Sequence, residues 1–241
     1  MENTKSKPNV IIIDGYGFIF RAFFSLKDLK TKSGIPTGAV HGFINMILKL
    51  YSGIHVDYVI LVFDSGSKSF RNEIYPEYKA NRAEAPEDLK PQFQIVRQAS
   101  HALNIKFCEA PGMEADDIIA TYCQNLSKQD VNTIVVTSDN DLMQLIELPN
   151  VSIFDPIKSK FISYQDIETK FGVKPRQIVD YLAIVGDASD NIPGVYGIGE
   201  KGAGELLKEF ESVEEIYENI ERVSKPRLKK LLLESKEKAF L

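Results

Sequence analysis

Three short runs of apolar residues stand out in the first part of the chain, and acidic residues follow each of them closely. The runs lie within Asn9–Asp14, Tyr58–Phe63 and Thr133–Thr137. Short apolar runs bounded by polar residues are typical of strands that are buried on both faces. We therefore predict three buried strands at these positions.

Helical spacing of apolar residues fills the segments between these strands. Apolar side chains recur at positions 40, 43, 44, 47, 48 and 51, and a second helical pattern runs from 88 to 103. A third helix is predicted to start near Glu114, and a hairpin is predicted at 151–154 and 161–163. Strands that alternate with helices are typical of a mostly parallel α/β sheet flanked by helices.

The pattern changes after residue 163, where only helices are predicted. Pro175, for example, suits the first turn of a helix. We therefore predict an α/β domain at residues 1–185 and a helical region at 186–241. Within the α/β domain, residues 65–91 are polar, contain prolines and are rich in charged residues, so this segment is expected to leave the core as a loop or a solvated helix.

Charge and composition exclude several classes of protein. The 241 residues include 29 Lys and Arg against 34 Asp and Glu, and the net charge of −5 excludes a uniformly basic coat for nucleic acid. Residues 222–238 nevertheless carry a charge of +5. No apolar run approaches the ~20 residues that span a bilayer, so we expect a cytoplasmic protein with no membrane partner. The two cysteines have no spacing typical of a disulfide framework or a zinc site.

The positions of the acidic residues are the most informative feature of the sequence. Asp14, Asp64 and the pair Asp139/Asp141 follow the predicted strands, and the carboxyl ends of parallel strands share one edge of a sheet. Further acids occur together at a predicted helix start and in a Gly-Asp-x-x-Asp segment. The complete set of nine is Asp14, Asp64, Glu114, Asp116, Asp117, Asp139, Asp141, Asp187 and Asp190.

Carboxylates that converge in this way repel one another unless cations offset their charge. A site with oxygen ligands only favours Mg²⁺ or Mn²⁺ over zinc, and two such ions can clamp the attacking and leaving oxygens of a phosphodiester. A second interpretation stays open for individual residues. An aspartate after a strand is often a helix cap, Asp116 and Asp117 are favourable at any helix start, and Asp190 can cap the turn that follows it.

The polar segment 65–91 interleaves cations with aromatic rings. Arg71, Tyr78, Lys79 and Arg82 combine groups that bind phosphates with a ring that can stack on bases. Lys79 and Arg82 are three residues apart and would share a helical face. An ordinary solvated surface is the alternative, because several glutamates dilute this charge.

The sequence from Gly197 to Gly202 matches G-x-G-x-x-G, the fingerprint of dinucleotide-binding folds. That fold needs a strand before the glycines, whereas Pro193 and Gly194 interrupt the preceding segment. We predict instead a tight turn between two helices, whose backbone N–H groups hold a nucleic-acid phosphate. An ordinary helix–helix turn is the alternative.

The order of these motifs resembles the bacterial 5′-nuclease family, and most of all the N-terminal 5′→3′ exonuclease domain of bacterial DNA polymerase I. Flap endonucleases are more distant relatives. The resemblance runs from about residue 9 to the end of the chain. The matching segments are Ile13-Asp-Gly15, Val62-Phe-Asp64, Tyr78-Lys79-x-x-Arg82, Glu114-Ala-Asp-Asp117, Thr137-Ser-Asp-x-Asp141, Gly186-Asp-x-x-Asp190 and Gly197-Ile-Gly-Glu-Lys201.

The resemblance implies a PIN-like α/β core, a helical arch at about 67–92 and a helix–three-turn–helix that grips duplex DNA, often with a bound K⁺. It implies that the nine acids are metal ligands, with Asp116, Lys79 and Arg82 in catalytic roles. The implied DNA contacts are Arg71, Tyr78, Lys79, Arg82, Gly197, Gly199 and Lys201. Two residues depart from the family pattern, namely Tyr196 where Pro is usual and Gly202 where Thr is usual.

The expected function is therefore that of a structure-specific 5′→3′ exonuclease or flap endonuclease, which acts on DNA with a free 5′ end or flap in replication and repair. Two Mg²⁺ ions, for which Mn²⁺ can substitute, are the expected cofactors. We expect a monomer in a bacterial, nucleoid-associated location, either joined to a DNA polymerase or working with one. The alternatives are a DNA-junction binding module without catalysis and a PIN-type ribonuclease.

Overall fold

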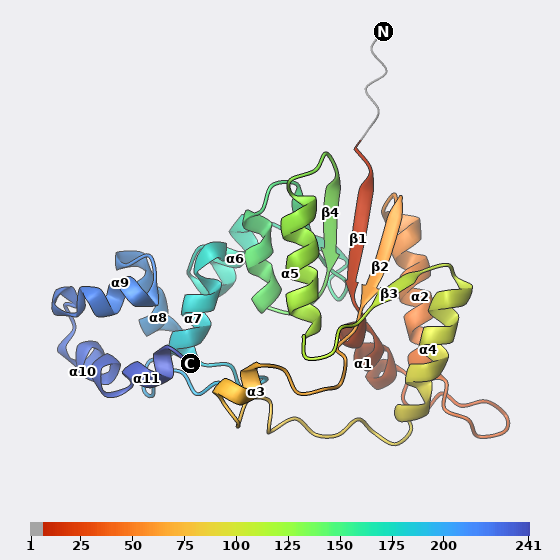
Figure 1. Ribbon diagram of the computed structural model, residues 1–241, viewed down its shortest axis with the longest axis horizontal. Helices are drawn as coiled ribbons and strands as arrows, with labels where there is room; N and C mark the ends of the chain where they lie inside the picture. Colours follow the sequence, from red (N-terminus) through yellow and green to blue (C-terminus); the bar gives the residue numbers. More distant parts are fainter. Residues whose placement is uncertain (1–6) are drawn as a thin grey trace, which may run out of the picture. The chain divides into compact units, whose positions relative to one another are not determined.

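The computed structural model describes residues 7–241, and these residues include a six-stranded sheet (Figure 1). The strand order is β3-β2-β1-β4-β5-β6, and the four pairings from β3 through to β5 are parallel. The strands are β1 (Asn9–Asp14), β2 (Tyr58–Val62), β3 (Lys106–Cys108), β4 (Asn132–Val136), β5 (Val151–Asp155) and β6 (Lys160–Ile162).

The strand order reverses beside β1, since the chain passes from β1 outward through β2 and β3 and then returns to β4 on the other side. In open α/β sheets, ligands bind outside the carboxyl ends of the strands at such a switch point. The end of β1 at Asp14 and the segment after β4 flank this point. The topology therefore places the predicted acids beside the crevice where this architecture binds its ligands.

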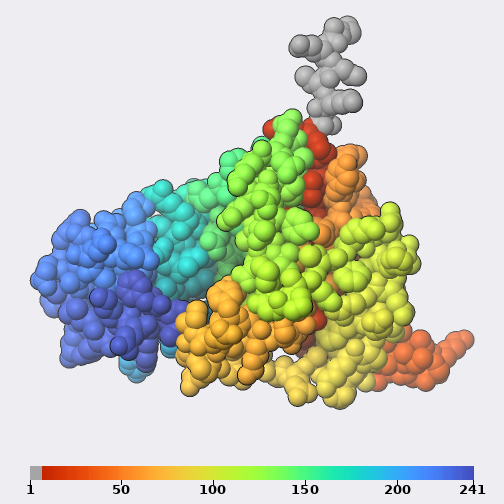
Figure 2. All heavy atoms as spheres, in the orientation of Figure 1, coloured from red at the N-terminus to blue at the C-terminus, as the bar shows by residue number. Residues whose placement is uncertain are grey.

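Helices cover both faces of the sheet, which explains why the central strands are apolar along their whole length. Ile11 and Ile13 of β1 belong to a buried core with helices α1 (Gly15–Ser25), α2 (Gly38–Gly53) and α4 (Lys90–Ala102). Ile12 points to the opposite face and is also fully buried. Helix α5 (Ala115–Leu126) packs against β1, β2 and β4 on that face, and in Figure 2 its green atoms lie beside the red atoms of the N-terminal strand.

The three predicted strands are confirmed as β1, β2 and β4, and the predicted helices are confirmed as α2, α4 and α5. The edge strand β3 escaped prediction because it has only three residues, which are exposed or half-buried. The segment after β4 forms a 3₁₀ helix, η1 (Asp141–Glu147). No helix within residues 7–241 is long and apolar enough to cross a membrane.

The contacts divide the chain into two compact units. The sheet unit comprises residues up to Ser67 together with Glu84–Phe161, and the helical unit comprises Lys68–Ala83 with Ile162–Leu241. The predicted boundary at 185/186 lies inside the helical unit. Its elements are α3 (Arg71–Ile74), α6 (Tyr164–Phe171), η2 (Pro175–Gln177), α7 (Ile178–Val185), α8 (Glu200–Glu209), α9 (Val213–Glu218), η3 (Ile220–Arg222), α10 (Pro226–Glu234) and α11 (Lys236–Ala239).

The polar segment 65–91 contains one short helix, the four-residue α3, among turns. Where the resemblance implies a helical arch, at about 67–92, the structure forms α3, a series of turns and the start of α4. A longer helix before α4 is disfavoured because Pro76 and Pro86 interrupt the segment and few apolar residues are available to stabilise it. Residues 68–83 instead gain their order from contacts with the rest of the helical unit.

Candidate active site

Asp14 lies at the junction of β1 and α1, where its side chain caps the helix. Its Oδ1 accepts a hydrogen bond from the backbone N–H of Gly17 at 3.2 Å, and its Oδ2 accepts one from the hydroxyl of Thr137 at 3.3 Å. A Cβ atom on Gly17 would lie only 2.7 Å from Oδ2. The glycine therefore gives the carboxylate room to fold over the start of the helix.

Two other predicted metal ligands raise the pKa of Asp14 by electrostatic repulsion. Burial raises the pKa of Asp14 from 3.8 to about 6, and repulsion from Asp139 and Asp64 adds to this rise, while the hydrogen bonds from Gly17 and Thr137 oppose it. All the charged groups that shift this pKa are carboxylates. The structure thus brings Asp14, Asp64 and Asp139 together at the carboxyl edge of the sheet, in an arrangement that favours a cation.

Asp64 connects the end of β2 with the start of α5. Its Oδ1 accepts a hydrogen bond from the backbone N–H of Ala115 at 2.8 Å. Because the first N–H groups of a helix have no partner within the helix, this bond fixes both the carboxylate and the helix end. Helix α5 is therefore anchored on one of the acids that the sequence assigns to the site.

Glu114 and Asp117 form a reciprocal capping box at the start of α5. The backbone N–H of Glu114 donates to Asp117 Oδ2 at 3.1 Å, and the Glu114 side chain accepts from the backbone N–H of Asp117. Asp116 lies in the same helical turn. The role at the helix start that the sequence left open for Asp117 is thus realised as a capping hydrogen bond, and Glu114, for which no cap was considered, is its partner. A carboxylate has about four acceptor sites, so a cap leaves it able to bind a cation as well.

Thr137 contacts two of the predicted metal ligands, although the sequence reasoning did not assign it to the site. It is almost completely buried, and its hydroxyl donates to Asp14 and accepts from the backbone N–H of Asp139 at 3.0 Å. Asp139 Oδ1 in turn accepts from the backbone N–H of Asp141 at 3.1 Å. The signal for this role was a hydroxyl residue directly after a buried strand and two positions before an acid, which is the spacing of a local side-chain turn.

The helical unit contains the other two predicted metal ligands. Asp187 Oδ1 accepts from both the backbone N–H and the hydroxyl of Ser189, at 2.7 and 2.5 Å. The backbone of Asp187 pairs with that of Ile192, which closes a small loop after α7. Gly186 has a φ of +87°, and a Cβ there would lie 2.7 Å from the Ile192 carbonyl oxygen. Only glycine fits this close approach.

Asp190 is held by side chains of residues 78–82. Its Oδ1 accepts from Arg82 at 2.5 Å, its Oδ2 accepts from the Tyr78 hydroxyl at 2.8 Å, and Lys79 Nζ lies 3.5 Å from Oδ2. Its side chain is only 13% exposed. We call these contacts, together with the hydrogen bond from the Lys79 backbone N–H to the Asp190 carbonyl, the Asp190 clasp. The clasp offsets the charge of Asp190 within the chain itself.

The clasp corrects one sequence interpretation. Tyr78 was expected to offer a ring for stacking on bases, but it is 7% exposed and its hydroxyl is committed to Asp190. Lys79 Nζ lies 4.9 Å from the centre of the same ring. Arg71, the other predicted contact in this segment, has its guanidinium carbon 4.7 Å from the ring centre of Phe70. The Tyr78 ring therefore serves packing in this structure, whereas the Phe70 ring is 52% exposed.

The glycine motif forms a turn before α8, as predicted. Gly197 has a φ of +84°, Gly199 is the residue before the helix, and Lys201 is exposed in the first turn. Tyr196 is 84% exposed on this turn. A Cβ on Gly202 would lie 2.9 Å from Ile198 Cγ2, so a larger side chain at position 202 would require Ile198 to shift.

Comparison with known proteins decides the family. A model of the 5′-3′ exonuclease N-terminal resolvase-like domain matches residues 9–172, and a model of the 5′-3′ exonuclease C-terminal SAM fold matches residues 173–241. The chain belongs to the 5′-3′ exonuclease family. The predicted resemblance is therefore confirmed.

Two relatives place the chain within the 5′-3′ exonuclease family. It is 39% identical to a 5′-3′ exonuclease of Aquifex aeolicus, over 92% of this chain and 78% of that protein. It is 40% identical to DNA polymerase I of Rhizobium leguminosarum, over 95% of this chain and 23% of the polymerase. The chain thus spans about a quarter of the length of the DNA polymerases that it matches.

Solved structures agree with the predicted fold class. The bacteriophage T5 protein co-crystallised with metal ions is 26% identical, with a TM-score of 0.78 over 96% of this chain and 86% of that one. The T5 flap endonuclease in a complex with DNA and metal ions gives the same values. The catalytic core of Rad2 shares the fold at 17% identity, with a TM-score of 0.57 over 96% of this chain and 74% of that one. The α/β fold with a C-terminal helical region is confirmed.

Proposed function

We propose that this member of the 5′-3′ exonuclease family hydrolyses DNA phosphodiesters near free 5′ ends, as a 5′→3′ exonuclease or flap endonuclease. The observation that carries the proposal is the group formed by Asp14, Asp64 and Asp139 at the switch point of the sheet, where the pKa of Asp14 rises to about 6. A protein that only binds DNA gains nothing from such repulsion, which lowers its stability.

The donor set fits a divalent cation of the magnesium type, because it consists of carboxylate oxygens. When bound, such an ion lowers the pKa of a coordinated water and offsets charge on the phosphodiester. We propose two Mg²⁺ ions, with Mn²⁺ as a substitute, and K⁺ at the turn before α8. The ligands in this proposal are the nine acids given above, including Asp187 and Asp190 from the helical unit.

The chain's own residues hold the site in order and bind the substrate. Thr137 and the Gly17 N–H orient Asp14, and the Ala115 N–H orients Asp64. We assign to Lys79 and Arg82 the stabilisation of charge on the scissile phosphate. Since both cations contact Asp190 in this structure, a phosphate must compete with that carboxylate for them.

The turn from Gly197 to Lys201 completes the proposed DNA interface. Backbone N–H groups at the start of α8 and the ammonium of Lys201 can hold a phosphate without reading the base sequence. Such contacts make binding strongly dependent on salt. The proposed partner is DNA with a 5′ end or flap. We also propose that the nuclease is joined to a DNA polymerase or acts with one.

A cleavage assay with matched substrates tests the proposal. The natural chain is incubated with flap DNA and with flap RNA of the same sequence, first with Mg²⁺ and then with a chelator. Cleavage of the DNA that the chelator abolishes supports the proposal. Intact DNA that is nevertheless bound would indicate a junction-binding module, and cleavage of RNA alone would indicate a ribonuclease.

An Asp116→Ala variant sharpens the assay, because Asp116 is proposed to act in catalysis. The variant should keep its circular dichroism spectrum and its affinity for flap DNA in Ca²⁺ while cleavage is lost. Asp130→Ala is a matched control, because Asp130 is exposed, lies beyond the end of α5 and pairs with Lys7 only at the surface. Full activity of Asp116→Ala would remove that residue from the site.

A further inference from the structure

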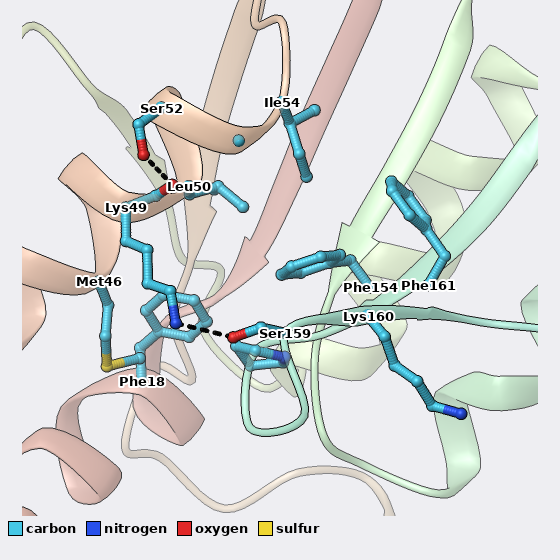
Figure 3. A pocket seen from close by; sticks show the side chains of 12 residues that line it. Phe18, Met46, Lys49, Leu50, Ser52, Ile54, Phe154, Ser159, Lys160 and Phe161 are labelled. Atoms are coloured by element: carbon cyan, nitrogen blue, oxygen red, sulfur yellow. Dashed lines mark hydrogen bonds between the residues drawn. The ribbon is translucent and has the colours of Figure 1, made fainter.

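The sheet unit also contains a pocket that is lined mostly by apolar residues and lies apart from the predicted metal ligands. It has a volume of about 390 Å³ and lies between the C-terminal half of α2 and the β5–β6 hairpin (Figure 3). This volume falls within the range of pockets that hold small molecules. Its walls are formed by Phe18, Met46, Lys49, Leu50, Ser52, Gly53, Ile54, Phe154, Pro156, Ser159, Lys160 and Phe161.

Most of this wall is apolar and held in place by packing. Phe18 and Leu50 belong to the buried core, and Phe154 packs against that core from the hairpin. The rings of Phe154 and Phe161 meet edge to face, with centroids 5.2 Å apart, which fixes the aromatic side of the pocket. Phe161 is still 49% exposed, so an apolar ring is left facing solvent. A ligand with an apolar body would cover surface that now contacts water.

The polar end of the pocket is positively charged. Lys49 reaches from α2 across to the hairpin, where its ammonium donates to the Ser159 hydroxyl at 2.9 Å (Figure 3). This partner is neutral, so it leaves the charge of Lys49 in place. Lys160 belongs to the same lining, although its ammonium points away from Lys49 in Figure 3, and the lining residues in this described part of the chain include no acid. An anionic group is therefore the natural counterpart of the apolar walls.

We propose that this pocket binds a medium-chain aliphatic carboxylate, with the hydrocarbon chain against Phe154, Phe161 and Leu50 and the carboxylate on Lys49. An ammonium–carboxylate hydrogen bond is stronger than the present bond to a neutral hydroxyl, so exchange of Ser159 for the ligand is favourable. The proposal is independent of the nuclease function, because none of the lining residues belongs to the proposed active site.

A series of ligands of increasing length tests the apolar part of the proposal. Calorimetric titration with hexanoate, octanoate and decanoate should show saturable binding whose affinity rises by up to about fourfold for each added methylene until the pocket is full. Octanol, which has the same body without the charge, should bind about tenfold more weakly than octanoate. Absence of saturable binding, or equal affinity for octanol and octanoate, would overturn the proposal.

Variants then locate the binding on the protein. Lys49→Gln should weaken decanoate binding by about tenfold, whereas Lys49→Arg should retain most of the affinity. Lys128→Gln is the matched control, because Lys128 is an exposed lysine of the sheet unit away from the pocket lining. Equal decanoate affinity of Lys49→Gln and Lys128→Gln would show adsorption elsewhere and would reject the site.

Gly53→Leu tests the volume of the pocket. A Cβ at Gly53 meets no atom within 4 Å, so the larger side chain fits without a clash and takes up space at the pocket wall. It should abolish decanoate binding while thermal unfolding and flap cleavage stay unchanged. If sedimentation instead showed a dimer of the natural chain that Gly53→Leu disrupts, a second copy would be the occupant, and the carboxylate proposal would be wrong.

Discussion

Asp14 and Asp190 are both proposed metal ligands, but the chain surrounds them differently. Asp14 is buried beside Asp64 and Asp139, and the donors that lower its pKa, Gly17 and Thr137, are neutral. Asp190 is nearly as inaccessible, yet Arg82, Lys79 and the Tyr78 hydroxyl surround its carboxylate. The charge of Asp14 and its neighbours in the sheet unit is thus left for a bound cation to offset. The charge of Asp190 in the helical unit is offset by Arg82 and Lys79 of the chain itself.

This difference suggests different roles for the two groups of acids. A cation that arrives beside Asp14 relieves repulsion and therefore gains free energy from several carboxylates at once. A cation at Asp190 shares that carboxylate with Arg82 and Lys79, which already offset its charge, so it gains less. We expect the acids of the sheet unit to dominate metal affinity, and the clasp to respond to the phosphates of the substrate.

The largest effect is expected from Asp14→Asn. Asparagine is as good a helix cap as aspartate, so the start of α1 should persist, but the negative ligand is lost. Cleavage of flap DNA should fall by more than the ~10–100-fold that is typical of a residue that only positions a metal ligand. The metal-free variant should also unfold at a higher temperature than the natural chain, because the buried charge is gone. A lower unfolding temperature would contradict the view that this charge is uncompensated.

The pH dependence of stability gives the second test. The pKa of Asp14 is about 6 in the folded protein against an ordinary value of 3.8, so the folded state holds the proton more tightly. The protonated Asp14 therefore contributes to the free energy of unfolding, and this contribution is fully present below pH ~4 and is lost as the pH rises through about 6. The difference between the two pKa values corresponds to about 3 kcal/mol. Urea unfolding of metal-free protein should show this loss.

Asp14→Asn serves as the control for that experiment. The variant has no group that titrates at position 14, so its stability should fall less between pH ~4 and pH ~7 than that of the natural chain. Added Mg²⁺ should recover stability at neutral pH in the natural chain and much less in the variant. Identical pH profiles for the two proteins would show that Asp14 carries no such penalty.

Thr137→Val probes the neutral donors that hold the acids of the sheet unit. The change removes the hydroxyl that donates to Asp14 and accepts from the Asp139 N–H, and keeps the shape of the side chain. Metal affinity should fall by about 10–100-fold, measured by calorimetry. Thr133→Val is a close control on β4, the strand that precedes Thr137, because the buried Thr133 hydroxyl has no hydrogen-bond partner among residues 7–241. That variant should bind metal normally and be at least as stable as the natural chain.

How much the sequence could predict also differs between the two regions. The strands that carry Asp14 and Asp64 are continuous apolar runs, and parallel topology alone brings their ends together. The Asp190 clasp joins residues that are 108 positions apart, such as Arg82 and Asp190. No local pattern indicates which carboxylate pairs with a given cation of segment 65–91. Sequence reasoning therefore singled out both Arg82 and Asp190 but did not predict that they form an ion pair.

The same limit explains the mistaken interpretation of Tyr78. An aromatic ring between cations is typical both of a base-stacking surface and of a tyrosine packed against its own fold. Only the partner of its hydroxyl, Asp190, distinguishes the two, and that partner lies far away in the sequence. Thr137 was more accessible to prediction, because its hydroxyl acts on Asp139 only two residues later.

The smallest effect is expected from Tyr78→Phe, which removes one hydrogen bond of the clasp and keeps the ring. The free energy of unfolding should fall by about 1–2 kcal/mol, since a buried hydroxyl that donates to a carboxylate is lost. Cleavage should change little if Lys79 and Arg82 leave Asp190 for the phosphate, because the clasp is then broken in the active complex anyway. Limited proteolysis of residues 68–83 without DNA should become faster. A large loss of cleavage with unchanged stability would show that the hydroxyl acts on the substrate instead, and the contrast between Asp14 and Asp190 would then need a different explanation.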